Sequence, residues 1–178
     1  PVVNGWTYYW HGSWDGQQQD WSSPDDRNAH GGTPFVAWYL QQMKAYDDQH
    51  GVRLLDYLDL HYYPQNRANE AAISLAPAGD AATQARRLRS TRSLWDPTYV
   101  DESWIADAGP EGGIVKLLPR MNDWVTQNYP GTKLAITEYN WGGLESINGA
   151  LAQADVLGIF GREGLDLATL FDPGQGDP

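Results

Sequence analysis

Apolar residues recur along this chain with two different spacings, and the two spacings alternate. Runs of β-branched, aromatic and aliphatic residues predict strands over residues 1–10, 54–63, 133–138 and 165–171. Apolar residues placed three and four apart predict helices over residues 35–50, 80–95, 117–125 and 146–162. The pattern therefore predicts strands and helices that follow one another in turn.

Residues with helix-capping chemistry stand at the ends of these patterns. Thr33 precedes Pro34, which predicts an N-cap residue followed by a proline at the first helical position. Later N-caps, and glycines that end helices, are expected at Asp80, Ser146, Gly51 and Gly164.

The order of elements favours parallel βαβ units within one domain. An open doubly wound sheet and part of a β/α barrel both satisfy it. No G-x-G-x-x-G or G-x-x-x-x-G-K-[ST] motif follows a strand, so a nucleotide-binding sheet lacks its main support. A complete eightfold barrel needs at least about 200 residues, and this chain has 178.

Charge and composition narrow the class of protein. The formal net charge of −11 argues against nucleic acid as a partner, and no apolar run is long enough to span a membrane. The absence of cysteine excludes disulfides and thiolate sites, and no ligand cluster has convincing spacing, so we expect no metal and no cofactor. One predicted helix carries four positive charges, at Arg86, Arg87, Arg89 and Arg92. A solvated helix face is a simpler interpretation of these charges than a binding patch.

The aromatic residues are unusual in kind. Nine Trp and ten Tyr stand against three Phe, which favours rings that carry a hydrogen-bonding group. Such rings suit the apolar faces of sugars, although core packing explains any single Trp equally well.

Candidate chemistry lies where two predicted strands end. Asp59, His61 and Tyr63 are spaced two apart and therefore point to one face. Glu138 follows the apolar run of the next strand, and ligands of parallel β/α folds bind beyond the carboxyl ends of the strands. A carboxylate there can be a nucleophile, a general base or a metal ligand. A structural ion pair is an equally good interpretation from the residues alone.

Three long segments resemble glycoside hydrolase family 44, a family of secreted β-1,4-glucanases. They are HGGTPFVAWYLQQMKAYDDQHGVRLLDYLDLHYYPQ, DAATQARRLRSTRSLWDPTYVDESW and NYPGTKLAITEYNWGGLESINGALAQADVLGIFGREGLDLATL. The resemblance implies a (β/α)8 TIM barrel joined to a β-sandwich domain, and a retaining mechanism with two glutamates. On this basis residues 1–178 correspond to the C-terminal half of the catalytic barrel, approximately strands 5 to 8 with their helices.

The resemblance also implies roles for individual residues. Glu138, in ITEYNWG, matches the nucleophile at the end of the seventh strand, and His61 and Tyr63 match catalytic positions on the sixth. Residues expected to contact the sugar are Trp10, Trp95, Trp104, Asn140, Trp141 and Phe171. Phe171 stands where many barrel glycosidases have a Trp.

Two parts of the family pattern do not occur in the chain. The acid/base glutamate of the family lies in an Asn-Glu-Pro segment, and no such segment occurs here. We therefore expect the first half of the barrel upstream of Pro1, and we expect this piece alone to be inactive and to expose unpaired strand edges. The start of the chain has neither an initiator Met nor a leader pattern, so secretion is an expectation from the resemblance alone.

The expected function is an endo-β-1,4-glucanase with a β-glucan polysaccharide or oligosaccharide as substrate. A non-catalytic carbohydrate-binding module is the alternative, although such modules are mostly antiparallel β-sandwiches. A protein that uses its aromatics at a partner interface would explain the Trp content but not the position of Glu138.

Overall fold

The computed structural model describes residues 28–29, 31–108, 111–172 and 174. The strand predicted over residues 1–10, and Trp10 with it, lies outside the described residues. Among the described residues, no helix is long and apolar enough to cross a membrane.

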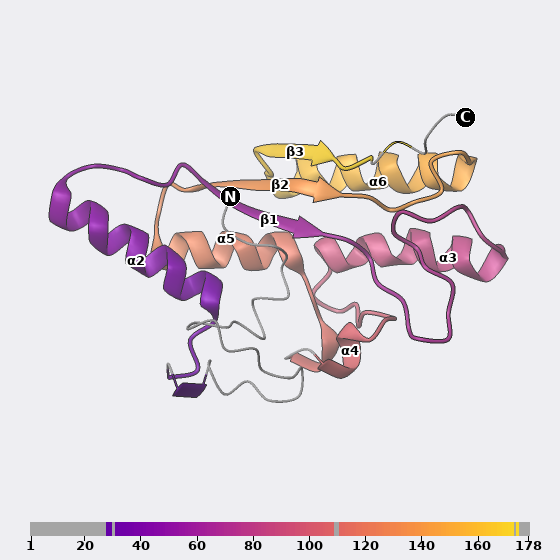
Figure 1. Ribbon diagram of the computed structural model, residues 1–178, viewed down its shortest axis with the longest axis horizontal. Coiled ribbons are helices and arrows are strands. Elements are labelled where there is room, and N and C mark those ends of the chain that lie inside the picture. Colours follow the sequence, from indigo (N-terminus) through magenta and orange to yellow (C-terminus); the bar gives the residue numbers. More distant parts are fainter. Residues whose placement is uncertain (1–27, 30, 109–110, 173, 175–178) are drawn as a thin grey trace.

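Three parallel strands form the sheet, in the order β1-β2-β3. They are β1 (Tyr57–Tyr62), β2 (Lys133–Tyr139) and β3 (Leu167–Leu170). The strands predicted at these three places are therefore confirmed, with β1 and β3 shorter than predicted. Because all three run in one direction, their carboxyl ends meet at one edge of the sheet (Figure 1).

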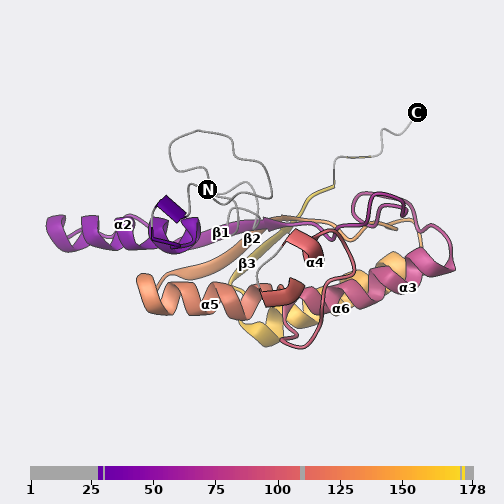
Figure 2. The same ribbon diagram turned by 90° about the horizontal axis from the view of Figure 1, so that it is seen from below.

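The helices connect these strands in sequence order. The long ones are α2 (Phe35–His50), α3 (Ala81–Ser90), α5 (Leu117–Asn128) and α6 (Ile147–Glu163). The short ones are η2 (Thr91–Leu94), which continues α3, α4 (Ile105–Ala108) and η3 (Glu111–Gly113). Figure 2 shows α3, α5 and α6 together on one side of the sheet.

Most of the predicted helix ends are confirmed. The side chains of Asp80 and Ser146 accept hydrogen bonds from backbone N–H groups three residues ahead. Gly51 and Gly164 end their helices in the left-handed conformation. The start of α2 differs by one residue, because Pro34 rather than Thr33 is the N-cap and no side chain caps this end.

The core lies between the sheet and the helix layer. In β1 the buried residues alternate with half-buried ones, as the period-two pattern predicts. Leu58, Leu60 and Tyr62 face the core at 1%, 0% and 0% exposure, and the ring of Tyr62 stacks on that of Trp141 at 5.5 Å. Asp59 and His61 therefore face away from the helices.

A β-bulge interrupts β2 near its carboxyl end. Asp59 of β1 is opposite Ala135, but His61 is opposite Glu138, so β2 has one residue more than β1 over this interval. The register between β2 and β3 is irregular over the same stretch, between Ile136 and Tyr139. The bulge allows two consecutive residues of β2, Thr137 and Glu138, to face the same side as His61, and both are half-buried.

The arginine-rich helix α3 does not present a simple solvated face. Arg86 and Arg87 are 8% and 0% exposed, so the prediction from the sequence is wrong for these two. Arg87 donates to the carbonyl oxygens of Trp141, Ala78 and Pro77 and to Asn148 Oδ1, at 2.7–2.9 Å. Three carbonyl oxygens from the loops after β1 and β2 thus converge on one guanidinium. Helical spacing in the sequence carries no information about that contact.

Candidate active site

Three side chains meet at the carboxyl ends of β1 and β2. The Tyr63 hydroxyl donates to Glu138 Oε2 at 3.0 Å, and His61 Nδ1 lies 3.2 Å from the same oxygen. His61 and Tyr63 point to one face because they are two residues apart at the end of one strand. The bulge in β2 brings Glu138 level with them.

The carboxylate of Glu138 is held at one oxygen and its side chain is partly exposed. Its side chain is 38% exposed, whereas that of His61 is 18% exposed. Both recorded partners contact Oε2, and within the described part of the chain Oε1 has no recorded partner. A carboxylate in this arrangement can attack an electrophile through Oε1 while Oε2 stays hydrogen-bonded.

Tyr63 is a hydrogen-bond donor over the whole neutral range. Burial raises the pKa of its phenol, and the hydrogen bond to Glu138 and the charge of that carboxylate raise it further. The phenol therefore keeps its proton, and the bond to Glu138 does not depend on a titration near neutral pH.

Thr137 connects His61 to a second carboxylate. Asp59 accepts from the Thr137 backbone N–H at 3.0 Å and from its hydroxyl at 2.6 Å. The same hydroxyl lies 3.3 Å from His61 Nε2. The period-two pattern placed Asp59 on the His61 face but gave no reason to include Thr137, because a regular strand would turn Thr137 away from Glu138.

Two of the predicted sugar-binding aromatics lie beside this site. Phe171 contacts the edge of the Tyr63 ring with centroids 6.4 Å apart, and it is 38% exposed. Trp104 Nε1 donates to Gln65 Oε1 at 3.3 Å, and Gln65 in turn donates to the carbonyl of Tyr63 at 2.7 Å. Contact of Phe171 and Trp104 with a sugar stays a prediction.

Three other residues predicted to contact the sugar are buried or lie away from Glu138: Trp141, Asn140 and Trp95. Trp141 is 2% exposed and its Nε1 donates to Ser90 Oγ at 3.0 Å, so it belongs to the core and does not line a cleft. Asn140 is 1% exposed; its side chain donates to the carbonyl of Phe171 and accepts from Gly142 N, which ties the ends of β2 and β3 together.

The prediction that Trp95 contacts the sugar is also wrong. The guanidinium of Arg162, in the last turn of α6, covers its ring at 4.1 Å from the centroid. The last turn of α6 precedes β3 and so lies near the amino end of that strand, away from Glu138. Trp95 is part of the helix layer and not a sugar platform at the strand ends.

Comparison with known proteins identifies the family. The sequence model described as glycoside hydrolase family 44 matches residues 1–66. Endoglucanase A of Paenibacillus lautus is 44% identical over 135 residues, which is 76% of this chain and 19% of that protein. The crystal structure of a family 44 xyloglucanase from Paenibacillus polymyxa is similar over 99% of this chain and 32% of its own, with 36% identity and a TM-score of 0.81.

The chain belongs to glycoside hydrolase family 44. A further similar structure is CelM2, described as a bifunctional glucanase-xylanase from a metagenome library, with 48% identity, a TM-score of 0.75 and coverage of 88% of this chain and 28% of its own. This family 44 chain thus spans about a fifth of the curated relative and about a third of the solved structures.

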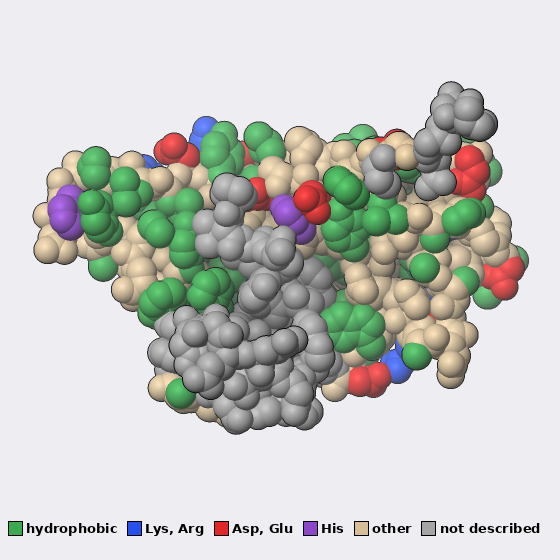
Figure 3. Space-filling model, in the orientation of Figure 1, with side chains coloured by type: hydrophobic (Ala, Val, Ile, Leu, Met, Phe, Trp, Pro, Cys, Tyr) green, Lys and Arg blue, Asp and Glu red, His purple; other side chains and the backbone are tan. Residues whose placement is uncertain are grey.

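The face of this family 44 chain shown in Figure 3 carries acidic and histidine side chains among apolar side chains, with few Lys or Arg. In the part of the chain that the structure describes, no group of three or more metal-ligating side chains is arranged to hold an ion.

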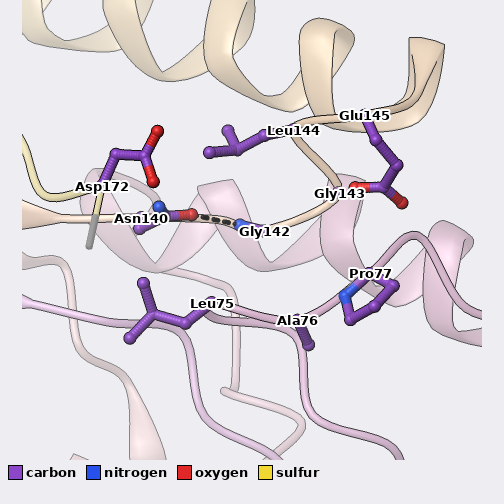
Figure 4. Close-up of a pocket in the computed structure, with 9 residues that line it drawn as sticks. All are labelled: Leu75, Ala76, Pro77, Asn140, Gly142, Gly143, Leu144, Glu145 and Asp172. Carbon is purple, nitrogen blue, oxygen red and sulfur yellow. Dashed lines mark hydrogen bonds between the residues drawn. The ribbon is translucent and has the colours of Figure 1, made fainter. Parts of the chain in front are cut away.

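A cavity of about 300 Å³ lies next to the site, between the loops that follow β1 and β2 (Figure 4). Asn140 and Asp172 lie on its wall, but Glu138, His61 and Tyr63 do not. The two loops approach closely because Gly142 has a positive φ of 68° and a Cβ there would lie 2.1 Å from the carbonyl oxygen of Ile73. The cavity is a neighbour of the candidate active site and not its centre.

Proposed function

We propose that this chain is part of a retaining glycoside hydrolase that cleaves β-1,4 bonds in cellulose-type glucans, with Glu138 as the nucleophile. The observation that carries the proposal is the partly exposed Glu138 carboxylate, whose Oε2 accepts from the Tyr63 hydroxyl and lies 3.2 Å from His61 Nδ1. The names of the relatives, which are endoglucanase, xyloglucanase and glucanase-xylanase, support a β-linked polysaccharide as substrate.

In the proposed first step, Glu138 Oε1 attacks the anomeric carbon and forms a glycosyl ester. The bond to the leaving oxygen breaks, and that oxygen takes a proton from a second carboxylic acid. Tyr63 and His61 keep Oε2 in place, so Oε1 is directed at the carbon. In the second step, water attacks the same carbon, the deprotonated second carboxylate removes its proton, and Glu138 leaves as a carboxylate.

We place the second carboxyl group in another part of the enzyme, because the Asn-Glu-Pro segment that the resemblance implies does not occur in this sequence. A retaining enzyme needs its two carboxyl groups about 5–5.5 Å apart. We propose that residues 1–178 form strands 5 to 8 of a (β/α)8 barrel, in which β1, β2 and β3 are strands 6 to 8. The acid/base residue and the β-sandwich domain then lie in the remainder of the longer enzyme.

Phe171 and Trp104 are the proposed sugar contacts. Phe171 contacts the Tyr63 ring directly, and Trp104 is linked to Tyr63 through Gln65. A Phe in place of Trp offers an apolar face without an indole donor. A polymer too large to enter a cell as substrate agrees with secretion, which is part of the proposal. The parallel sheet does not suit the alternative of a carbohydrate-binding module.

Substitution of the nucleophile tests the proposal. In the intact enzyme, Glu138→Gln should lower hydrolysis of a soluble β-glucan by at least about 10³-fold and leave glucan binding in affinity electrophoresis close to that of the wild type. Glu163→Gln is the matched control, because Glu163 is paired with Arg162 at the far end of α6. Activity of Glu138→Gln comparable to that of Glu163→Gln would refute the assignment.

A further inference from the structure

The hydroxyl of Thr137 lies between a carboxylate and an imidazole. It donates to Asp59 Oδ2 at 2.6 Å and lies 3.3 Å from His61 Nε2. The backbone N–H of Thr137 donates to the other oxygen of Asp59 at 3.0 Å. Asp59 therefore receives two hydrogen bonds from one residue, and this fixes the direction of both.

A hydroxyl has one proton, and that fact determines the state of His61. Because the Thr137 proton points to Asp59, its oxygen can only accept from His61 Nε2, which must then carry a proton. The other ring nitrogen, Nδ1, faces Glu138 Oε2 at 3.2 Å. A neutral ring with its proton on Nε2 would direct the lone pair of Nδ1 at the carboxylate.

We propose that Asp59 and Thr137 are positioning residues that keep a proton on His61 Nε2, so that His61 donates to ionised Glu138 only as an imidazolium. The inference rests on the proposed function for the role of Glu138 as nucleophile. Asp59 and Thr137 do not touch the reacting atoms; they act through His61.

The arrangement has a consequence for catalysis. Before attack, the imidazolium faces a carboxylate and stabilises its ionised, nucleophilic form. After attack, the same imidazolium faces a neutral ester. Loss of a proton from His61 breaks a hydrogen bond at either nitrogen, so the neutral ring should support less activity than the imidazolium.

Few other groups can influence this ring. Among the described residues, the titratable neighbours are Asp59 and Tyr63 from β1 and Glu138 from β2. From β3, the Thr169 hydroxyl bonds the carbonyl of Thr137 and carries no charge. Asp172, just beyond β3, lies on the wall of the neighbouring cavity.

Two substitutions that nearly keep the size of the side chain disrupt this arrangement of protons. In Asp59→Asn, the amide oxygen still accepts from Thr137 N, so the NH₂ group faces the hydroxyl and donates to it. The Thr137 proton must then turn to His61 Nε2, which favours a neutral ring with its proton on Nδ1. Thr137→Val removes the acceptor for Nε2–H altogether, whereas Thr137→Ser keeps it.

The test is the pH dependence of kcat/KM in the intact enzyme, with a dinitrophenyl β-cellobioside as substrate. A leaving group this good needs little general acid, so the basic limb reports His61 rather than the acid/base residue. We expect the basic limb to lie at lower pH in Thr137→Val, to flatten in Asp59→Asn because its neutral ring still donates from Nδ1, and to superimpose on the wild type in Thr137→Ser.

Each outcome has a separate meaning. Basic limbs of Asp59→Asn and Thr137→Val that coincide with the wild type would overturn the inference while leaving the nucleophile assignment intact. An active Glu138→Gln variant would instead overturn the proposed function. Thermal unfolding identifies a misfolded variant, and if Thr137→Val does not fold, the profile of Asp59→Asn decides.

Discussion

Thr137 and Glu138 are consecutive in β2, yet their side chains contact the two different nitrogens of the His61 ring. In a regular strand consecutive side chains point to opposite faces. The bulge between the Asp59 and His61 register positions removes this constraint. The irregularity thus brings a nucleophile candidate and a positioning residue to one imidazole.

Tyr63→Phe should reduce catalysis without affecting the fold. The variant loses the hydrogen bond to Glu138 Oε2, and a hydrogen bond to a charged group contributes about 1.5–3 kcal/mol. We therefore expect kcat/KM for glucan hydrolysis to fall about 10- to 100-fold. Because burial and Glu138 raise the pKa of this phenol, the loss should be uniform between pH 5 and 8.

Tyr57→Phe is the matched control for this measurement. Tyr57 lies at the amino end of the same strand, where its ring is covered by the Lys133 ammonium. Equal losses of activity in Tyr57→Phe and Tyr63→Phe would show that the Tyr63 contact has no special role.

Trp141→Ala should destabilise the protein. The ring is buried against Tyr62, and truncation of a buried Trp costs about 3–5 kcal/mol. The measurement is urea unfolding followed by circular dichroism.

Trp104→Ala should instead raise KM for glucan with a smaller loss of stability, because Trp104 is half-buried beside the site. A Trp141→Ala variant of wild-type stability that binds glucan weakly would contradict the core assignment.

Arg87→Met should be among the most destabilising changes in α3. It leaves the carbonyl oxygens of Trp141, Ala78 and Pro77 and the Oδ1 atom of Asn148 without this donor, and each buried acceptor left unsatisfied costs about 1–3 kcal/mol. Arg89→Met is the control on the same helix: Arg89 pairs with Glu102 at the surface, where a pair contributes about 0–1 kcal/mol. Similar unfolding midpoints for the two variants would count against the buried network.

The sequence predicted the order of elements well because that order depends on local periodicity and capping. The three described strands, the long helices and the ends at Asp80 and Ser146 all follow from residues close together in the chain. His61, Tyr63 and Glu138 were found because parallel strands end at one edge of a sheet. Local information was sufficient up to this point.

The errors arose where distant segments meet. Trp141 looks like a cleft residue beside Glu138, but the chain turns after β2 and buries the ring on Tyr62 and Ser90. Arg87 looks like a solvated residue, but carbonyl groups from two loops converge on it. The bulge at Thr137 has no signature in the run KLAITEY, since the shift shows only against the neighbouring strands.

Trapping of the covalent intermediate tests the central claim most directly. The intact enzyme would be incubated with a 2-deoxy-2-fluoro cellobioside that carries a good leaving group, and the labelled peptide would be sequenced by mass spectrometry. The account predicts one added fluorocellobiosyl group on Glu138, and no label in Glu138→Gln. A label on another carboxylate, or rapid turnover of natural glucan with no covalent species at Glu138, would contradict it.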